Sequence, residues 1–268
     1  MTRAYSLAYL TCNGVDPVTA VGIAAEHGYG MVSFRLLPAG PGDSLFPLLT
    51  DDALLREVKA ALRDTGVSMA DAEMIRLNTK TRLEDFTPFL DRIADLGARH
   101  VLVAVDDPEH GRSQDNYTAL CALLGTYKLT ADLEFMPWTG VKDLAHARRM
   151  VEAADHPAAA VLFDSLHFDR SSSTLEEFAA LPPGLMNYVQ ICDGPVPYDP
   201  SDEELIRVAR TARLIPGEGG IDLASIAGLI PEGMTISVEV PNHALAGTAG
   251  ASEVARRALQ ATKELLGD

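Results

Sequence analysis

Four side chains with oxygen donors stand near the ends of four successive apolar segments in the second half of the chain. They are Glu134, Asp164, Gln190 and Glu239. Their neighbours are mostly apolar, as in Val238-Glu239-Val240. Alternation along an extended strand turns each of these residues away from its two neighbours. We therefore expect all four side chains to point to one side of a sheet, at the end where its strands finish.

This donor set is suited to a divalent metal ion, because three carboxylates buried together without a cation would be strongly destabilising. Gln190 adds an amide oxygen, so the set contains oxygen donors only, which favours Mn²⁺ or Mg²⁺ over Zn²⁺. Such an ion, chelated by a hydroxy-ketone, polarises the carbonyl and stabilises the enediolate left when the neighbouring carbon loses a proton. Reprotonation gives an isomer or epimer, and loss of a β-hydroxyl gives a dehydrated product.

The four segments belong to a regular alternation of β-prone runs and amphipathic stretches, the pattern of parallel strands joined by crossover helices. We expect strands at Ala4–Leu10, Met31–Arg35, Ser68–Ile75, His100–Val105, Thr130–Phe135, Ala160–Asp164, Asn187–Ile191 and Thr235–Val240. We expect helices near Val18–His27, Asp52–Thr65, Leu83–Leu96, Gln114–Tyr127, Val141–Ala154, Leu175–Leu181, Asp202–Ala212 and Glu253–Leu266. Eight units in 268 residues average about 33 residues, which is typical of a closed barrel. The sequence thus predicts an α/β protein, a single-domain (β/α)₈ TIM barrel over residues 1–268, with its active site at the carboxyl ends of the strands.

Composition narrows the class of partner. The chain has 22 basic and 38 acidic residues, a formal charge of −16, which disfavours binding to nucleic acid. No apolar run is long enough to span a bilayer, so we expect no membrane partner. The three cysteines, Cys12, Cys121 and Cys192, are far apart and form no CxxC pair, which favours a reducing, cytoplasmic location. The expected partner is a small-molecule substrate.

Several motifs in the C-terminal half resemble those of the xylose isomerase-like TIM-barrel superfamily of sugar phosphate isomerases and epimerases. They are Leu133-Glu134-Phe135-Met136-Pro137-Trp138, Leu162-Phe163-Asp164-Ser165-Leu166-His167, Val189-Gln190-Ile191-Cys192-Asp193, Pro216-Gly217-Glu218-Gly219 and Ser237-Val238-Glu239-Val240-Pro241. The resemblance implies a barrel with a metal site. By analogy with other barrels of this kind, it also makes a homodimer the expected assembly.

The resemblance also implies roles for individual residues. The superfamily's epimerases use carboxylates at the positions of Glu134 and Glu239 as metal ligands and acid/base groups together. His167 corresponds to a histidine that contacts a substrate oxygen, and Arg213 to a substrate-contacting arginine. Both Glu134 and Glu239, with His167, are therefore the expected catalytic residues.

The reaction stays open between two subfamilies. Many epimerases have a histidine at the position of Gln190 and a further glutamate at that of Gly140. A glutamine ligand, with an arginine before a Pro-Gly turn, resembles the 3-dehydroshikimate dehydratases, yet their histidine shortly after the strand-five ligand is missing. We expect an isomerase or epimerase of a small polyhydroxylated carbonyl compound, a sugar or keto-polyol. The alternative is a 3-dehydroshikimate dehydratase-like lyase at the same metal site.

Other polar or aromatic residues near the ends of strands are candidates for substrate contact. Arg35 and Arg76 end or follow early strands and can hold a carboxylate or phosphate. Trp138, the only tryptophan, can form a wall for a ring-shaped substrate. We expect these three residues, with His167 and Arg213, to bind the substrate.

Two further classes share the fold. The endonuclease IV group needs more histidine ligands for its zinc ions and a basic DNA-binding face, and this acidic chain with seven histidines offers neither. A sugar-binding barrel without turnover would fit the missing epimerase residues. The presence of all four candidate ligands argues against it.

Overall fold

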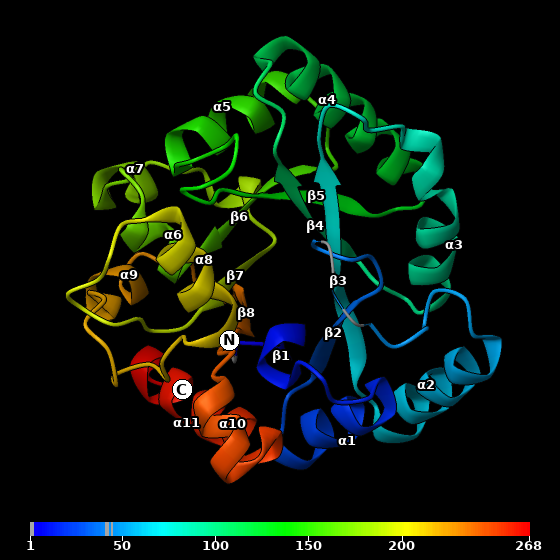
Figure 1. Ribbon diagram of the computed structural model, residues 1–268, viewed down its shortest axis with the longest axis vertical. Coiled ribbons are helices and arrows are strands. Elements are labelled where there is room, and N and C mark those ends of the chain that lie inside the picture. Colours follow the sequence, from blue (N-terminus) through cyan, green and yellow to red (C-terminus); the bar gives the residue numbers. More distant parts are fainter. Residues whose placement is uncertain (1–2, 41–42, 44) are drawn as a thin grey trace.

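The computed structural model describes residues 3–40, 43 and 45–268, in which eight parallel strands close into a barrel surrounded by helices (Figure 1). The strands follow one another around the barrel in chain order, and β8 pairs with β1. Their bounds are β1 Tyr5–Leu7, β2 Met31–Arg35, β3 Ser68–Leu77, β4 His100–Val105, β5 Thr130–Glu134, β6 Ala159–Asp164, β7 Tyr188–Ile191 and β8 Thr235–Val238. The predicted single-domain TIM barrel is confirmed. Its predicted bounds, 1–268, include Met1, Thr2, Pro41, Gly42 and Ser44, which lie outside the described residues.

Most of the longer helices form the outer ring (Figure 1). The longer helices are α1 Pro17–His27, α2 Asp52–Thr65, α3 Thr87–Asp95, α4 His110–Thr126, α5 Leu144–Ala154, α8 Asp202–Thr211 and α11 Ala251–Leu266. Of these, α8 lies nearer the centre in Figure 1. Shorter helices are α6 Ser165–Arg170, α7 Leu175–Ala179, α9 Leu223–Ala227 and α10 His243–Ala249, and 3₁₀ turns are η1 Tyr9–Cys12, η2 Leu83–Phe86 and η3 Pro183–Leu185. All eight expected helices are present. The ends of Asp52–Thr65 are as predicted, the others are shifted at one end or both, and Leu83–Leu96 is divided into η2 and α3. Helices α6, α9 and α10 were not predicted.

The first and last strands are shorter than predicted. One side chain accounts for both differences: Thr11 donates a hydrogen bond to Val238 O at 2.9 Å and accepts one from Val240 N at 2.8 Å. The hydroxyl thus takes hydrogen bonds that a longer ladder between β1 and β8 would have used. The chain therefore leaves β1 at Leu7 and turns across the rim in η1.

Apolar and polar residues are separated between the two faces of the barrel wall. The outward faces of the strands pack with the helices in one large core, which includes Leu133, Val161 and Ile236. Inside the barrel a smaller apolar cluster, with Leu102 and Leu162, lies among buried polar side chains. Within the described residues no helix has the length and apolar character needed to cross a membrane.

Candidate active site

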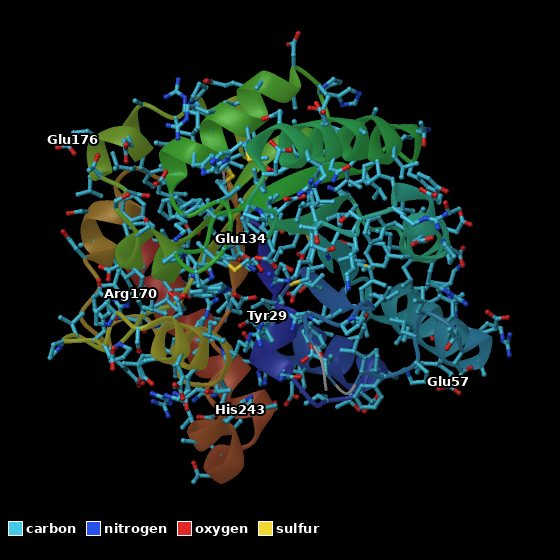
Figure 2. All side chains as sticks on the ribbon, turned by 45° about the horizontal axis from the view of Figure 1, so that its top comes forward. Tyr29, Glu57, Glu134, Arg170, Glu176 and His243 are labelled. Atoms are coloured by element: carbon cyan, nitrogen blue, oxygen red, sulfur yellow. The ribbon has the colours of Figure 1, made fainter. Side chains whose placement is uncertain are left out.

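The four predicted metal ligands lie together at the carboxyl ends of β5 to β8. Asp164 and Gln190 are paired across neighbouring strands, and Glu239 follows directly after β8. Each of the four residues is at most 4% exposed. In Figure 2 Glu134 lies in the middle of the molecule, whereas Glu57 and Glu176 stand at its outer edge. The strand pattern predicted this convergence, because each candidate ligand stands at the carboxyl end of one strand and these ends meet at one side of a barrel.

Gln190 is oriented by its neighbour. Its amide donates a hydrogen bond from Nε2 to Oε1 of Glu239 over 3.1 Å. The other amide atom, Oε1, is buried and has no hydrogen-bond partner among the described residues. A buried acceptor without a donor is costly unless something positive meets it. This oxygen is the observation that fits a metal ion, which would satisfy it together with the carboxylates.

Arg213 connects two of the carboxylates. One guanidinium nitrogen lies 2.5 Å from Oδ2 of Asp164, and another lies 2.8 Å from Oε2 of Glu239. Its Nε donates to Ala209 O at 2.8 Å, and the side chain is only 2% exposed. The predicted substrate-contacting arginine is therefore also the internal counter-ion of the site.

Helix α6 places His167 beside Glu134. Asp164 caps this helix by accepting hydrogen bonds at Oδ1 from the backbone N–H groups of Leu166 at 2.8 Å and His167 at 3.0 Å. His167 Nε2 consequently lies 3.8 Å from Oε1 of Glu134, and its buried Nδ1 has no partner among the described residues. Glu134, Asp164 and His167 offer ligand atoms within 4.8 Å of one another, so this trio is a second possible donor set for a metal ion.

Burial sets the protonation of these groups. Burial, together with the charges of Asp164 and Glu239, raises the pKa of Glu134 well above its usual range. Burial also raises the pKa of Glu239 to about 8, against the opposing effect of Arg213. The pKa of Asp164 is lowered, since Arg213 outweighs its burial. Burial lowers the pKa of His167 to about 4, so its imidazole is neutral near pH 7.

A cavity of about 440 Å³ opens above this cluster and brings in the remaining predicted residues. Arg35, Arg76 and Trp138 line it together with Glu134, His167, Arg213 and Glu239. Asp164 and Gln190 do not reach its surface; they lie behind Arg213 and Glu239, to which they are hydrogen-bonded. The rings of Trp138 and His167 meet edge to face, with centroids 5.1 Å apart.

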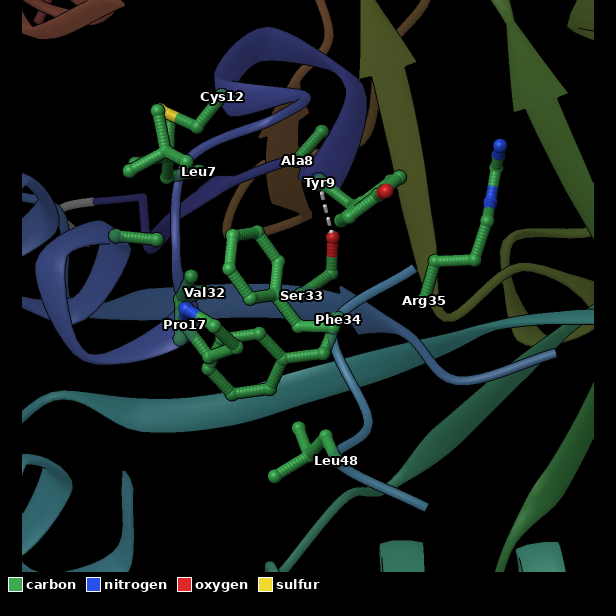
Figure 3. Close-up of a pocket in the computed structure, with 13 residues that line it drawn as sticks. Leu7, Ala8, Tyr9, Cys12, Pro17, Val32, Ser33, Phe34, Arg35 and Leu48 are labelled. Carbon is green, nitrogen blue, oxygen red and sulfur yellow. Dashed lines mark hydrogen bonds between the residues drawn. The ribbon is translucent and has the colours of Figure 1, made fainter. Parts of the chain in front are cut away.

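A second hollow of about 400 Å³ lies beside the first, between β2, η1 and α1 (Figure 3). Its wall is mainly apolar, with Leu7, Val32, Phe34 and Leu48, and the side chain of Arg35 points away from it. At its edge Tyr9 N donates to Ser33 Oγ at 2.7 Å. The described residues that line this hollow include no acid/base pair, whereas Glu134, His167 and Glu239 all line the first cavity.

The sequence did not single out three residues of this region. Arg210 lines the cavity from the last turn of α8. Asp71, fully buried inside the barrel, has two carboxylate oxygens without partners among the described residues. Asp193 accepts hydrogen bonds from Gly194, Gly217, Gly219 and Ile221 and so shapes the turn after Arg213. Asp193 is the last residue of one of the motifs that carry the family resemblance, but no role of its own was predicted for it.

The family described as xylose isomerase-like TIM barrel matches residues 21–265. The chain belongs to this family. None of the curated proteins matches it.

Solved structures of the same fold include proteins with different activities. The IolI protein with a bound zinc atom shares 18% identity over 98% of both chains, with a TM-score of 0.82. The probable 3-DHS dehydratase AsbF from Bacillus anthracis shares 15% identity over 97% of this chain and 98% of its own, with a TM-score of 0.74. D-psicose 3-epimerase from Clostridium cellulolyticum H10 shares 14% identity over 98% of this chain and 99% of its own, with a TM-score of 0.72. These likenesses establish the fold, and they include both reaction types that the sequence left open.

Proposed function

We propose that this protein is a divalent-metal-dependent isomerase or epimerase of a small polyhydroxylated carbonyl compound. The observation that carries the proposal is the convergence of Glu134, Asp164, Gln190 and Glu239 at one end of the barrel, with Gln190 Oε1 unsatisfied. These four residues would hold one Mn²⁺ or Mg²⁺ ion, because all their donor atoms are oxygens. When bound, the ion would polarise the substrate carbonyl and stabilise negative charge on its oxygen.

Glu134 and Glu239 are the proposed acid/base pair. They come from β5 and from the end of β8, and both line the same cavity. In the protein without metal both have raised pKa values, so each can carry a proton near neutral pH. One glutamate would remove the proton beside the carbonyl, and the other would return a proton to the opposite face or to the neighbouring carbon.

The remaining lining residues would hold the substrate. His167 and Arg213 stand beside the two glutamates, and Trp138 supplies an apolar wall against His167. Arg35 lies 2.6 Å from Glu73, and Arg76 is paired with Asp106, so both guanidinium groups are held in place. Fixed donors of this kind orient hydroxyl and carbonyl oxygens without losing much conformational freedom on binding.

A dehydratase-like lyase is the second candidate, and His167 favours it. Its buried imidazole is neutral near pH 7, lies 3.8 Å from Glu134, and has no partner for Nδ1 among the described residues. A β-elimination needs a group that gives a proton to the departing hydroxyl in addition to the base. Glu134, whose pKa is raised, would give that proton, and the neutral imidazole of His167 would hydrogen-bond the departing hydroxyl.

Assembly and location extend the proposal. The three cysteines are buried free thiols, and burial raises the pKa of each to about 12, so they are unreactive. This agrees with a reducing, cytoplasmic setting.

We propose that the protein is a homodimer. Light scattering during gel filtration measures the molar mass of the assembly and tests this proposal.

Proton NMR in D₂O tests the function. Protein freed of divalent metal is compared with Mg²⁺-loaded protein. Each sample is mixed with ketoses, inososes and 3-dehydroshikimate. Deuterium exchange with a new sugar isomer supports the isomerase or epimerase, whereas a vinylic or aromatic product establishes the lyase. Binding without exchange of any compound in the panel would favour a sugar-binding barrel.

Glu134→Gln and Glu57→Gln make a matched pair for this assay. Glu57 is exposed on α2 at the outer edge of the molecule, so the same chemical change there leaves the site untouched. We expect Glu134→Gln to abolish exchange and Glu57→Gln to keep it. Full exchange and unchanged metal affinity in Glu134→Gln would refute the site.

A further inference from the structure

The four arginines that line the cavity differ in one respect. Arg35, Arg76 and Arg213 each have a carboxylate partner inside the protein: Glu73 for Arg35, Asp106 for Arg76, and Asp164 with Glu239 for Arg213. Arg210 forms no ion pair or side-chain hydrogen bond with any described residue. In an acidic protein, a cation left unpaired at a cavity is available to a ligand.

The surroundings of Arg210 keep it unpaired. The carboxylates whose charges act on it are Asp43 and Asp106, and neither is within ion-pair distance. Asp43 instead accepts a hydrogen bond from Ala39 N at 2.7 Å, and Asp106 is paired with Arg76. Partial burial and the positive charge of Arg76 lower the pKa of Arg210, which shows that the two cations act on each other. An anion between them would relieve this repulsion.

Other donors in the same wall are also unsatisfied. The Nε–H groups of Arg35 and Arg76 are buried and have no partner among the described residues. In each of these guanidinium groups a terminal nitrogen donates a hydrogen bond to a carboxylate of the protein, whereas Nε is left without an acceptor. Buried donors are normally paired, so these two sites point to a missing acceptor.

The arginines are graded by depth. The side chain of Arg213 is 2% exposed at the floor, that of Arg35 is 11% and that of Arg76 is 21% exposed, and Arg210 is exposed at the rim. The proposed metal ligands lie at the floor with Arg213. A ligand that reaches from floor to rim therefore meets an unpaired cation at its outer end.

We propose that the substrate carries an anionic group, a carboxylate or a phosphate, at the end away from the metal ligands, and that Arg210 binds it together with Arg76. This rests on the proposed function, whose substrate class it narrows from any small polyhydroxylated carbonyl compound to an anionic one. Arg210 is then a specificity-determining residue: it acts on affinity for the charged group and stays outside the proton-transfer steps.

Calorimetric titration with three related polyols tests the proposal. The probes are D-gluconate, D-glucitol 6-phosphate and uncharged D-glucitol, each added to Mn²⁺-loaded protein. We expect at least one charged probe to bind about tenfold or more tightly than D-glucitol, because a charge-assisted pair with arginine strengthens binding by at least that factor. The tighter of the two charged probes identifies the group as carboxylate or phosphate.

Two arginines of α8 provide the variant and its control. Arg210→Gln is expected to bring charged and uncharged probes to within about threefold of each other and to leave the D-glucitol affinity unchanged. Arg207→Gln, one turn earlier, removes an arginine that pairs with Glu204 at the surface and should keep the full preference. Both sites are exposed, so both variants should fold.

The outcomes separate this inference from the proposed function. Equal affinity for all three probes in the wild type, no binding of either charged probe at millimolar concentration, or a preference that survives Arg210→Gln would each overturn the inference. Mn²⁺ affinity is measured in the same samples. Failure to bind Mn²⁺, with an anion preference that depends on Arg210, would overturn the metal-dependent function and leave the anion site standing.

Discussion

Gln190 donates its amide hydrogen to Glu239 across 3.1 Å, and this single contact decides which way its amide faces. With Nε2 committed to the carboxylate, the amide oxygen is left in the buried cluster as an acceptor. A histidine at this position would offer a nitrogen ligand instead. The glutamine therefore keeps the donor set all-oxygen, which is the basis for expecting Mn²⁺ or Mg²⁺.

The first prediction follows from that contact. Gln190→Leu keeps the approximate volume but removes the oxygen, so we expect the affinity for Mn²⁺ to fall by at least about tenfold, since even outer-shell changes cost about that much. Tyr188→Phe is the control, because it removes a buried hydroxyl from the same strand without touching the four ligands. Titration calorimetry measures both. Equal Mn²⁺ affinity in Gln190→Leu and wild type would remove Gln190 from the site.

The second prediction separates the two possible donor sets. If the four oxygen donors hold the ion, His167→Ala should leave Mn²⁺ affinity within about threefold of wild type and slow solvent exchange by about tenfold, the usual cost of one lost hydrogen bond to the substrate. His110→Ala, at an exposed site on α4, is the control for losing a histidine. A large loss of Mn²⁺ affinity in His167→Ala would instead assign the ion to Glu134, Asp164 and His167.

The sequence predicted the strands and the convergence of the four candidate ligands because both depend on short-range patterns. Alternation around Glu134 and Glu239 reports which face each side chain takes, and the barrel then brings strand ends together. The contact between Arg213 and Asp164 joins residues 49 positions apart, and no local pattern encodes it. Helix α6 was missed for a similar reason: Asp164 reads as the end of a strand, yet its carboxylate also caps the helix that follows.

Arg210 and Thr11 are two further residues whose positions could not be predicted from local sequence patterns. On α8, Arg210 reads as an ordinary basic residue in the last turn of a helix, and only the closed barrel places it at the cavity. The hydroxyl of Thr11 ends β1 and β8 through hydrogen bonds to residues more than 200 positions away. Such contacts depend on how the two ends of the chain meet, which propensity and periodicity do not report.

The third prediction concerns pH and the protein without metal. The raised pKa values of Glu239, about 8, and of Glu134 mean that the folded state holds protons that the unfolded state has released. Stability should therefore fall as pH rises, and for Glu239 alone the loss between about pH 6.5 and 8 is about 2 kcal/mol. The lowered pKa of His167 acts with the opposite sign, but only below about pH 6.5.

Urea unfolding in EDTA at several pH values measures this change. Saturating Mn²⁺ should reduce the decline, because a bound ion lowers the pKa values of the carboxylates that hold it in the folded state. Glu239→Gln, which cannot ionise, should reduce it without metal. A stability that is constant or rises from pH 6.5 to 8 in EDTA would contradict the protonation assigned to the cluster.

The last prediction concerns the turn that follows Arg213. Asp193 is 2% exposed and accepts four backbone hydrogen bonds at 2.8–3.1 Å, from Gly194, Gly217, Gly219 and Ile221. Its own backbone pairs with Leu214, directly after the arginine. Asp193→Ala leaves those N–H groups without their acceptor, so we expect a loss of about 3 kcal/mol in the free energy of unfolding and a melting temperature lower by roughly 6–12 °C.

Glu218→Ala is the matched control, because Glu218 belongs to the same turn but pairs with Arg257 at the surface and should change the melting temperature little. Since the turn fixes the backbone that carries Arg213, Asp193→Ala should also loosen the bridge to Asp164 and Glu239 and alter Mn²⁺ affinity. Calorimetric melting followed by Mn²⁺ titration separates the two effects. If Asp193→Ala has the same melting temperature as the wild type and binds Mn²⁺ equally well, the Asp193 carboxylate does not position the site.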